Sequence, residues 1–556
     1  MKKIVLSILG MGLFAQLALA GGIVTNTNQS AAWVRSLVRD ASLSTDAVYF
    51  NPAGVARMAD GFYIQVSNQT ISQTKTITNE YPLLNNKTFI GDVAAPLFPS
   101  VYAVYKKGNF AVHAGFGVVG GGGSADYKTG LPSFEVPVSG IPASLTANKI
   151  PTTAYSAAIN FSGTSSYMGI QLGASYKINE FIAVGLGVRY IMAKNTYKGY
   201  IRDIMINPNY PAFGAKYNGS MVSAPGFFTD GANILTTLSA GATQMAAGFG
   251  QIVAGGGGSV LLSNGTVVGL TATQVAQAQQ LIGATGMNPA TMTIQQAQAV
   301  LAAAAPAFQA KAGAMAANAA GTANVEVDAE QAGTSLTPIF SVDLSMLDGN
   351  LGIALKYEHK TPLELKNATT VDGSGMFPND ALVPAEMPSL FSLGVRYNIM
   401  EKFRTQIGVH YYLDRSAKYG KMDPATKEYV TNGANVIPLA DGTKGPYLDG
   451  NSFEAGIALE YDIAKFISLS AGYLYTSSSP TSAYQTDLNY SLQTSSVGVG
   501  AIVHLKDRLE INLGFSNTFY TDGSKSITYP SVGAVTESYK KTTSVIAVGL
   551  GYRFGK

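Results

Sequence analysis

The feature that most constrains the fold is a two-residue alternation of large and small side chains, which is clearest over residues 544–554. The bulky apolar and aromatic side chains of this segment share one face: Ile546, Val548, Leu550, Tyr552 and Phe554. Alanine, glycine and arginine occupy the other face. A strand that is bulky on one side and small or polar on the other is typical of a transmembrane β-barrel, where the two faces meet lipid and lumen.

The same alternation recurs in segments that are joined in pairs by short polar turns. We predict fourteen strands, at 61–75, 98–106, 109–119, 165–176, 181–206, 337–347, 350–367, 387–398, 402–415, 452–462, 465–477, 489–505, 508–521 and 538–554. Six of their connections are short and seven are long, and the two kinds alternate. This alternation is expected of a barrel with both chain ends on one side of a membrane, because short turns then lie on that side and long loops on the other. The strands of a soluble β-sandwich also alternate apolar and polar side chains, but that fold gives no reason for short and long connections to alternate.

Composition excludes several other classes of protein. Hydrophobic residues make up 46% of the chain and its net charge is only +3, which excludes general disorder. The chain has no cysteine, so disulfides and cysteine-ligated metal sites are excluded. The 37 basic and 34 acidic residues nearly balance, so the chain lacks the excess positive charge typical of a nucleic-acid-binding protein. Beyond the N-terminus no apolar run reaches the roughly 18 residues of a transmembrane helix.

Residues 1–20 have the pattern of a secretory signal peptide. Lys2 and Lys3 are followed by an apolar stretch, and Ala18-Leu19-Ala20 supplies a small-residue cleavage signal. The alternative is an uncleaved anchor helix, but the apolar stretch is short. We therefore expect cleavage after Ala20 and export from the cytoplasm.

No motif for catalysis, metal binding or nucleotide binding stands out. The four histidines are isolated from one another, and no nucleophile elbow is present. Residues 115–120 match the glycine pattern of dinucleotide-binding loops, but more glycines follow where a helix is required. We therefore predict no catalytic residue, no cofactor and no metal site.

The longest connection, 207–336, has an unusual composition. Residues 231–310 contain no charged side chain, and residues 301–320 include 12 alanines. Helix-forming residues over 272–318 predict two or three short helices, broken near Gly286 to Pro289 and at Pro306. The insertion is either a lid or apolar capture surface over the mouth of the barrel, or a surface insertion that packs on itself.

Two segments resemble a known family. Residues 39–42 and 46–56, which include Asn51-Pro52-Ala53-Gly54 just before the first strand, are similar to the hatch segment of the FadL/TodX family of outer-membrane transporters for hydrophobic compounds. Residues 470–480 are similar to that family's glycine–aromatic strand ending in Ser-Pro. The insertion at 231–320 and the two residues after Phe554 depart from the family pattern.

Together with the strand pattern, the resemblance implies an all-β fold, a 14-stranded antiparallel barrel, with 21–58 as a hatch or plug inside it and 59–556 as the barrel. The composition of the insertion and the alternation of short and long connections predict 207–336 as a helical extracellular loop. It implies a passive, multi-pass channel in the outer membrane of a Gram-negative bacterium, without enzymatic activity. Hydrophobic molecules such as long-chain fatty acids would be captured outside and released sideways into the membrane. The expected partners are the lipid bilayer, lipopolysaccharide, the outer-membrane assembly machinery and the ligand, with the chain acting as a monomer.

Three sets of residues are candidates for this function. The hatch candidates are Val48, Tyr49, Phe50, Asn51, Pro52, Ala53 and Gly54. The candidates for a kink in the third strand and a lateral opening are Gly115, Gly117 and Gly120, since interior glycines weaken and bend strands. The lumen cations that could bind a ligand carboxylate are Arg189, Arg396 and Arg404, which could equally form a structural ion network.

Two other functions remain open from the sequence. A diffusion porin for small hydrophilic solutes would conduct steadily and would not need the apolar residues of the hatch. A surface adhesin or scaffold would use the large insertion and would not need its lumen.

Overall fold

The computed structural model describes residues 24–418, 421–422, 429–430, 437–438, 444–445, 448–482, 484–505, 508–529 and 532–554. The predicted signal peptide at 1–20 and the residues after Phe554 lie outside this part of the chain. The chain divides into two compact units. Within the described part of the chain, the barrel unit comprises residues 24–136, 159–200 and 325–554, and the helical unit comprises Pro137–Ala158 and Ile201–Asn324.

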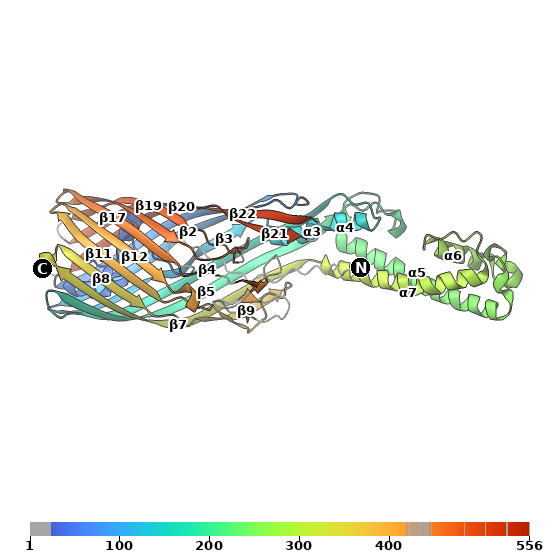
Figure 1. Cartoon of the computed structure of the whole chain (residues 1–556), viewed down its shortest axis with the longest axis horizontal. Coiled ribbons are helices and arrows are strands. Elements are labelled where there is room, and N and C mark those ends of the chain that lie inside the picture. Colours follow the sequence, from blue (N-terminus) through green and yellow to red (C-terminus); the bar gives the residue numbers. More distant parts are fainter. Residues whose placement is uncertain are drawn as a thin grey trace. The chain divides into compact units, whose positions relative to one another are not determined.

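The strands wrap into a barrel (Figure 1). Fourteen antiparallel strands of the described chain form it, and the pairing of the first strand with the last closes it. These strands are β1 (Gly61–Asn79), β2 (Thr88–Lys107), β3 (Phe110–Tyr127), β4 (Tyr155–Lys177), β5 (Ile182–Ile206), β7 (Val325–Met346), β8 (Leu351–Glu358), β11 (Leu390–Met400), β12 (Phe403–Tyr412), β17 (Phe453–Ala464), β18 (Ile467–Ser477), β19 (Thr494–Leu505), β20 (Leu509–Tyr520) and β22 (Gly533–Phe554). The predicted fold class and strand number are confirmed.

The two faces of the barrel wall differ as the alternation predicts. On β22, the side chains of Ile546, Val548 and Leu550 are 48–60% exposed, whereas Val545 and Ala547 are at most 5% exposed. Exposed apolar side chains recur on other strands, for example Val66, Leu186, Ile407, Ile457 and Leu513. A wall that is apolar outside and closed to solvent inside suits a lipid environment.

Several strands are longer than predicted. β2 begins at Thr88 and β3 continues to Tyr127, so the glycine cluster 120–123 lies within β3 and does not follow it. The predicted strand 350–367 is in fact two strands, β8 and β9 (Glu364–Asp372). Both pair with β7, β8 along its second half and β9 along 327–332. The proline at 362 lies in the break between them and has no backbone donor for a ladder.

Shorter elements complete the described structure. They are β6 (Val222–Ser223), β10 (Leu382–Pro384), β13 (Lys421–Met422), β14 (Tyr429–Val430), β15 (Ile437–Pro438), β16 (Lys444–Gly445), β21 (Gly523–Tyr529), α3 (Pro132–Ser139), α4 (Ile141–Ala147) and the 3-10 turns η2 (Pro211–Phe213), η3 (Gly257–Ser259), η4 (Leu262–Val268), η5 (Leu347–Gly349) and η6 (Asp414–Ser416). β10 pairs with β9, and β21 pairs with the first residues of β22.

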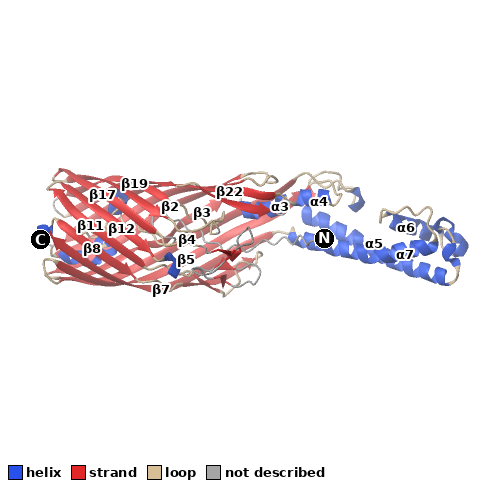
Figure 2. Cartoon of the chain, in the orientation of Figure 1, coloured by secondary structure: helices blue, strands red, loops and turns tan. Residues whose placement is uncertain are grey.

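The helical unit is built on a pair of long helices, α5 (Ala224–Ala254) and α7 (Ile294–Gly321), with α6 (Ala272–Gly283) between them in sequence (Figure 2). The buried residues of α5 and α7 combine alanines with larger apolar side chains such as Phe249 and Phe308, and the Ser239 hydroxyl donates to the carbonyl of Ala305 at 2.8 Å. The expectation of short helices broken at Pro306 was wrong, because α7 runs through this proline. Packing against α5 outweighs the one helical hydrogen bond that proline removes. In the described chain, no helix is long and apolar enough to cross a bilayer.

Candidate functional site

The described N-terminal residues, 24–58, form a segment that is buried against the inner face of the barrel wall. It contains α1 (Ala31–Ser36), α2 (Ala47–Phe50) and the 3-10 turn η1 (Pro52–Arg57). Trp33 and the hatch candidates Val48, Tyr49 and Phe50 are each at most 3% exposed. The Ser30 hydroxyl caps α1 by accepting from the Trp33 amide. We call residues 24–58 the N-terminal segment.

A row of inward-facing glycines makes room for this segment. A Cβ placed on Gly498 would lie 2.6 Å from the Val34 carbonyl oxygen, and one on Gly514 would lie 2.9 Å from the Arg35 amide nitrogen. A Cβ on Gly394 would come within 2.5 Å of the Asp40 backbone. Glycine in a strand permits such close approach of a second backbone. These small residues on the lumen face therefore allow the segment to lie directly on the wall.

The Asn51-Pro52-Ala53-Gly54 turn is hydrogen-bonded both to itself and to the wall. The Asn51 side-chain oxygen accepts from the Gly54 amide at 3.2 Å. A Cβ on Gly54 would lie 2.9 Å from the Ser42 carbonyl oxygen, so a larger residue does not fit there. The Ala53 amide donates to the Ser341 hydroxyl of β7 at 2.9 Å. The four motif residues thus form one compact turn fixed to the barrel.

Asp343 on β7 is the central acceptor beneath this turn. Its carboxylate is fully buried and accepts from the Asn51 side chain at 2.8 Å. It also accepts from Arg57 of η1 at 2.5 Å and from Arg396 of β11 at 2.6 Å. Arg396, a candidate for binding a ligand carboxylate, is therefore engaged with a carboxylate of the protein itself.

Arg189 is part of a second cluster, around α2. Its guanidinium bonds to Glu358 at 2.5 Å and to Gln171 at 2.8 Å. It also lies 4.7 Å from the ring centroid of Tyr49. Lys356 contacts the same ring at 4.6 Å and donates to the Tyr49 carbonyl at 3.0 Å. Two cations therefore hold α2 by its aromatic side chain.

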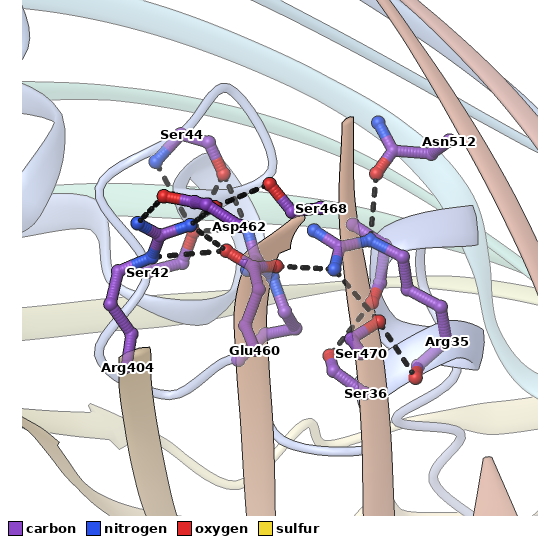
Figure 3. Close-up of polar contacts among 12 residues, drawn as sticks. Arg35, Ser36, Ser42, Ser44, Arg404, Glu460, Asp462, Ser468, Ser470 and Asn512 are labelled. Atoms are coloured by element: carbon purple, nitrogen blue, oxygen red, sulfur yellow. Dashed lines mark hydrogen bonds and ion pairs between the residues drawn. The ribbon is translucent and has the colours of Figure 1, made fainter. Parts of the chain in front are cut away.

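The third cation, Arg404, belongs to a network that anchors α1 (Figure 3). Arg35 of α1 forms an ion pair with Glu460 of β17 and donates to Asn512 of β20 at 2.9 Å. Arg404 donates to Glu460 at 2.9 Å and to Asp462 at 2.7 Å. All three predicted lumen cations are thus paired with protein carboxylates.

Sequence reasoning missed the partners of His410, because it considered only the spacing of the four histidines from one another. The His410 ring contacts Asp40 of the N-terminal segment at 2.5 Å and Glu454 of β17 at 2.8 Å. The Tyr412 hydroxyl donates to Glu454 at 2.8 Å. Asp40 lies 370 residues before His410, so no local sequence pattern could reveal the contact.

The loop between α1 and α2 has its own buried ion pair. Arg39 bonds to both oxygens of Asp46, at 2.9 and 2.8 Å. The hydroxyl groups of Ser42 and Ser44 also donate to Asp46. Burial alone would raise the pKa of Asp46, but the Arg39 charge and these hydrogen bonds lower it from 3.8 to about 2.

The pairing between β2 and β3 is interrupted in the middle of the wall. Ala94 pairs with Ser124 and the next pair is Val101 with Phe116, so residues 95–100 of β2 and 117–123 of β3 are not paired with each other. The prolines at 96 and 99 fall within this break. On its other side, the β3–β4 pairing shifts register at 118/120 and again at 121/123.

The N-terminal segment covers the edge of β3 at this break. The Asn26 amide donates to the Val119 carbonyl at 2.9 Å, and the Gln29 side chain donates to Val118 at 2.7 Å. A Cβ on Gly120 would lie 2.6 Å from the Val24 carbonyl oxygen, and one on Gly115 would lie 3.1 Å from Val48. Gly117 faces the Gln29 side chain. The three predicted glycines therefore lie beneath the segment, and Gly117 and Gly120 are in the break.

Comparisons with known proteins bear on the fold. The sequence matches no family model, and no curated protein matches it. A crystal structure of a Pseudomonas aeruginosa FadL homologue is similar, with 12% identity, a TM-score of 0.57, and coverage of 96% of this chain and 100% of that one. A deletion mutant of the TodX monoaromatic hydrocarbon channel has 12% identity and a TM-score of 0.51 over 97% and 100% of the two chains. The Pseudomonas putida toluene transporter TodX has 11% identity and a TM-score of 0.50 over 95% and 99%.

These likenesses extend over nearly the whole chain at low identity. They agree with the closed barrel of fourteen strands described above. The resemblance that the sequence indicates is therefore confirmed at the level of the fold, and the chain has the barrel fold of the FadL and TodX structures.

Proposed function

We propose that the chain is an outer-membrane channel for the passive uptake of hydrophobic molecules, with long-chain fatty acids as the main ligands. The N-terminal segment, as the larger part of the predicted hatch at 21–58, gates the lumen. The ligand leaves sideways into the membrane through the break between β2 and β3.

The observation that carries this proposal is an apolar cluster in the barrel interior beside the break. It includes Ile71, Phe98, Tyr102, Val118, Val119 and Val545, all at most 6% exposed. A channel for hydrophilic solutes needs a wet, polar lumen. Each methylene moved from water to such surroundings contributes about 0.8 kcal/mol, so an acyl chain gains steadily with length.

The break between β2 and β3 supports a lateral route. An unpaired stretch of wall can widen without the loss of ladder hydrogen bonds. The bonds from Asn26 and Gln29 to β3 hold the N-terminal segment over this stretch. Displacement of residues 24–29 would therefore free the passage.

The anchors of the N-terminal segment support its role as a gate. They are charged and connect to many strands, so the segment has one defined closed position. Ligand binding beside α2, where Tyr49 and Val48 contribute to the apolar cluster, would favour a different position.

The neighbouring structures include toluene and monoaromatic hydrocarbon channels, so aromatic hydrocarbons are the alternative ligand class. We propose the lipid bilayer, lipopolysaccharide and the assembly machinery as partners, and a monomeric state. The helical unit would lie outside the cell and assist capture.

The test is ligand titration of the purified protein in a nonionic detergent, together with conductance measurements in planar bilayers. We expect saturable binding of labelled palmitate, which deletion of residues 22–54 weakens at least tenfold. A second variant replaces 224–321 with a short linker and should retain binding. Steady conductance by the wild type without palmitate binding would instead favour a hydrophilic porin. If neither signal appears, the adhesin hypothesis becomes the better account.

A further inference from the structure

Two buried lysines face each other inside the barrel wall. Lys75 of β1 and Lys541 of β22 are direct cross-strand partners. Their side chains are 2% and 5% exposed. Both approach one aromatic ring, that of Tyr490 in the β18–β19 connection, at 6.0 and 4.4 Å from its centroid. Lys541 also donates to the Tyr490 carbonyl at 2.5 Å.

These two lysines differ from every other buried cation of the described chain. Seven lysines and arginines are buried there, and five of them form ion pairs: Arg35, Arg39, Lys106, Arg189 and Lys356. Lys75 and Lys541 form none among the described residues. The nearest acid on the same inner face, Glu537, is two rungs away and accepts from Asn79 and Tyr539 instead.

Two ammonium groups side by side in such a place are unfavourable unless one of them loses its proton or an anion binds between them. A buried ammonium group loses its hydration, and a second one beside it adds repulsion that the interior screens poorly. The ring of Tyr490 and a single carbonyl offset only part of this cost. An anion between the two ammonium groups would accept from both in charge-assisted hydrogen bonds.

Apolar side chains lie on both sides of the pair along the same two strands, with polar rungs between them. One rung further up the same two strands are Ile77 and Tyr539, in an apolar cluster with Tyr127 and Leu488. In the other direction a polar rung, Gln73 with Thr543, precedes Ile71 and Val545 of the cluster at the β2–β3 break. A ligand whose head lies at the lysines would therefore place its tail against apolar side chains.

We propose that Lys75 and Lys541 bind the carboxylate of a long-chain amphiphile, so that the chain prefers acids to neutral hydrocarbons. This inference rests on the proposed function and specifies its ligand. The lysine pair is distinct from Arg189, Arg396 and Arg404, each of which has a protein carboxylate already.

The test compares two probes of equal chain length, palmitate and hexadecanol, by titration of the full-length protein in a nonionic detergent. We expect the wild type to bind palmitate at least about tenfold more tightly than hexadecanol. The double variant Lys75→Met/Lys541→Met keeps the side-chain length and removes both charges. It should lose this preference, with hexadecanol binding changed by less than about twofold. The matched control is Lys540→Met, since Lys540 is adjacent, 62% exposed and paired with Asp522.

The outcomes separate this inference from the proposed function. Equal affinity of the wild type for the acid and the alcohol overturns the lysine site and leaves hydrophobic uptake standing. Unchanged acid preference in the double variant also overturns it. Retained hexadecanol binding shows that the variant is folded. Binding of neither probe by the wild type overturns both proposals.

Discussion

The glycine row on the lumen face leads to a quantitative prediction about the N-terminal segment. In Gly498→Ala, the new methyl group would lie 2.6 Å from the Val34 carbonyl oxygen and 2.8 Å from Leu37, whereas ordinary contacts begin at 3.4 Å. The segment must therefore move by several tenths of an ångström. Overpacking of this size costs about 1–3 kcal/mol. If the segment bears this cost, its local opening becomes about 5- to 150-fold more frequent.

Amide hydrogen exchange measures this opening directly. We expect exchange over residues 31–37 to accelerate within that range, while β18, β19 and β20 stay protected. Trp33 is the only tryptophan of the chain, so its fluorescence reports on the same segment. The matched control is Gly551→Ala, where the nearest atoms lie at an ordinary 3.6 Å. Unchanged exchange in Gly498→Ala, equal acceleration in the control, or loss of protection in the strands instead would refute the reasoning.

Three further predictions concern buried charges. Asp343→Asn should lower the free energy of unfolding by about 3–5 kcal/mol in denaturant titrations, because it leaves Arg57 and Arg396, whose side chains are 8% and 12% exposed, without their buried carboxylate. Asp522→Asn, which breaks an exposed pair, should change it by less than about 1 kcal/mol, and equal effects would contradict this account. The pKa of Asp46 is lowered from 3.8 to about 2, so its contribution of about 2 kcal/mol is complete above pH 3.8 and is lost as the pH falls through 2. The difference in thermal stability between the wild type and Asp46→Asn should accordingly vanish near pH 2, and a gap that stays constant with pH would argue against it. Lys75→Met should raise the free energy of unfolding of the ligand-free protein by about 1–3 kcal/mol, since it removes an unpaired buried charge. A free energy of unfolding below that of the wild type would indicate that Lys541 does not repel Lys75.

The strands could be predicted because each wall residue meets one of two different environments. Ile546 and Ala547 differ in size for this reason, and the parity of the turns then fixes the closed ring. The alternation is weaker where β2 and β3 extend past the predicted ends, over 88–97 and 120–127, and their length was underestimated there. Pro306 misled the helix prediction because packing against α5, which is not visible in the sequence, decides whether α7 continues.

The candidate site could be located from sequence but not assembled. The Asn51 motif identified the N-terminal segment, since its local hydrogen bonds depend on neighbouring residues. Its main partner, Asp343, lies 292 residues away. The pairing of the lumen arginines and the isolation of Lys75 follow from strand register, which alternation alone does not specify.

The enclosure of the N-terminal segment also determines an order of assembly. Arg35 bonds to Asn512, which is 477 residues further along the chain, and the ring closes only when β22 pairs with β1. Contacts of such sequence separation form slowly and late. The apolar side chains near Trp33 therefore stay uncovered until the C-terminal strands arrive. The N-terminal segment is therefore made early and protected late, and a chaperone that shields it during this interval would raise the yield of folded barrel.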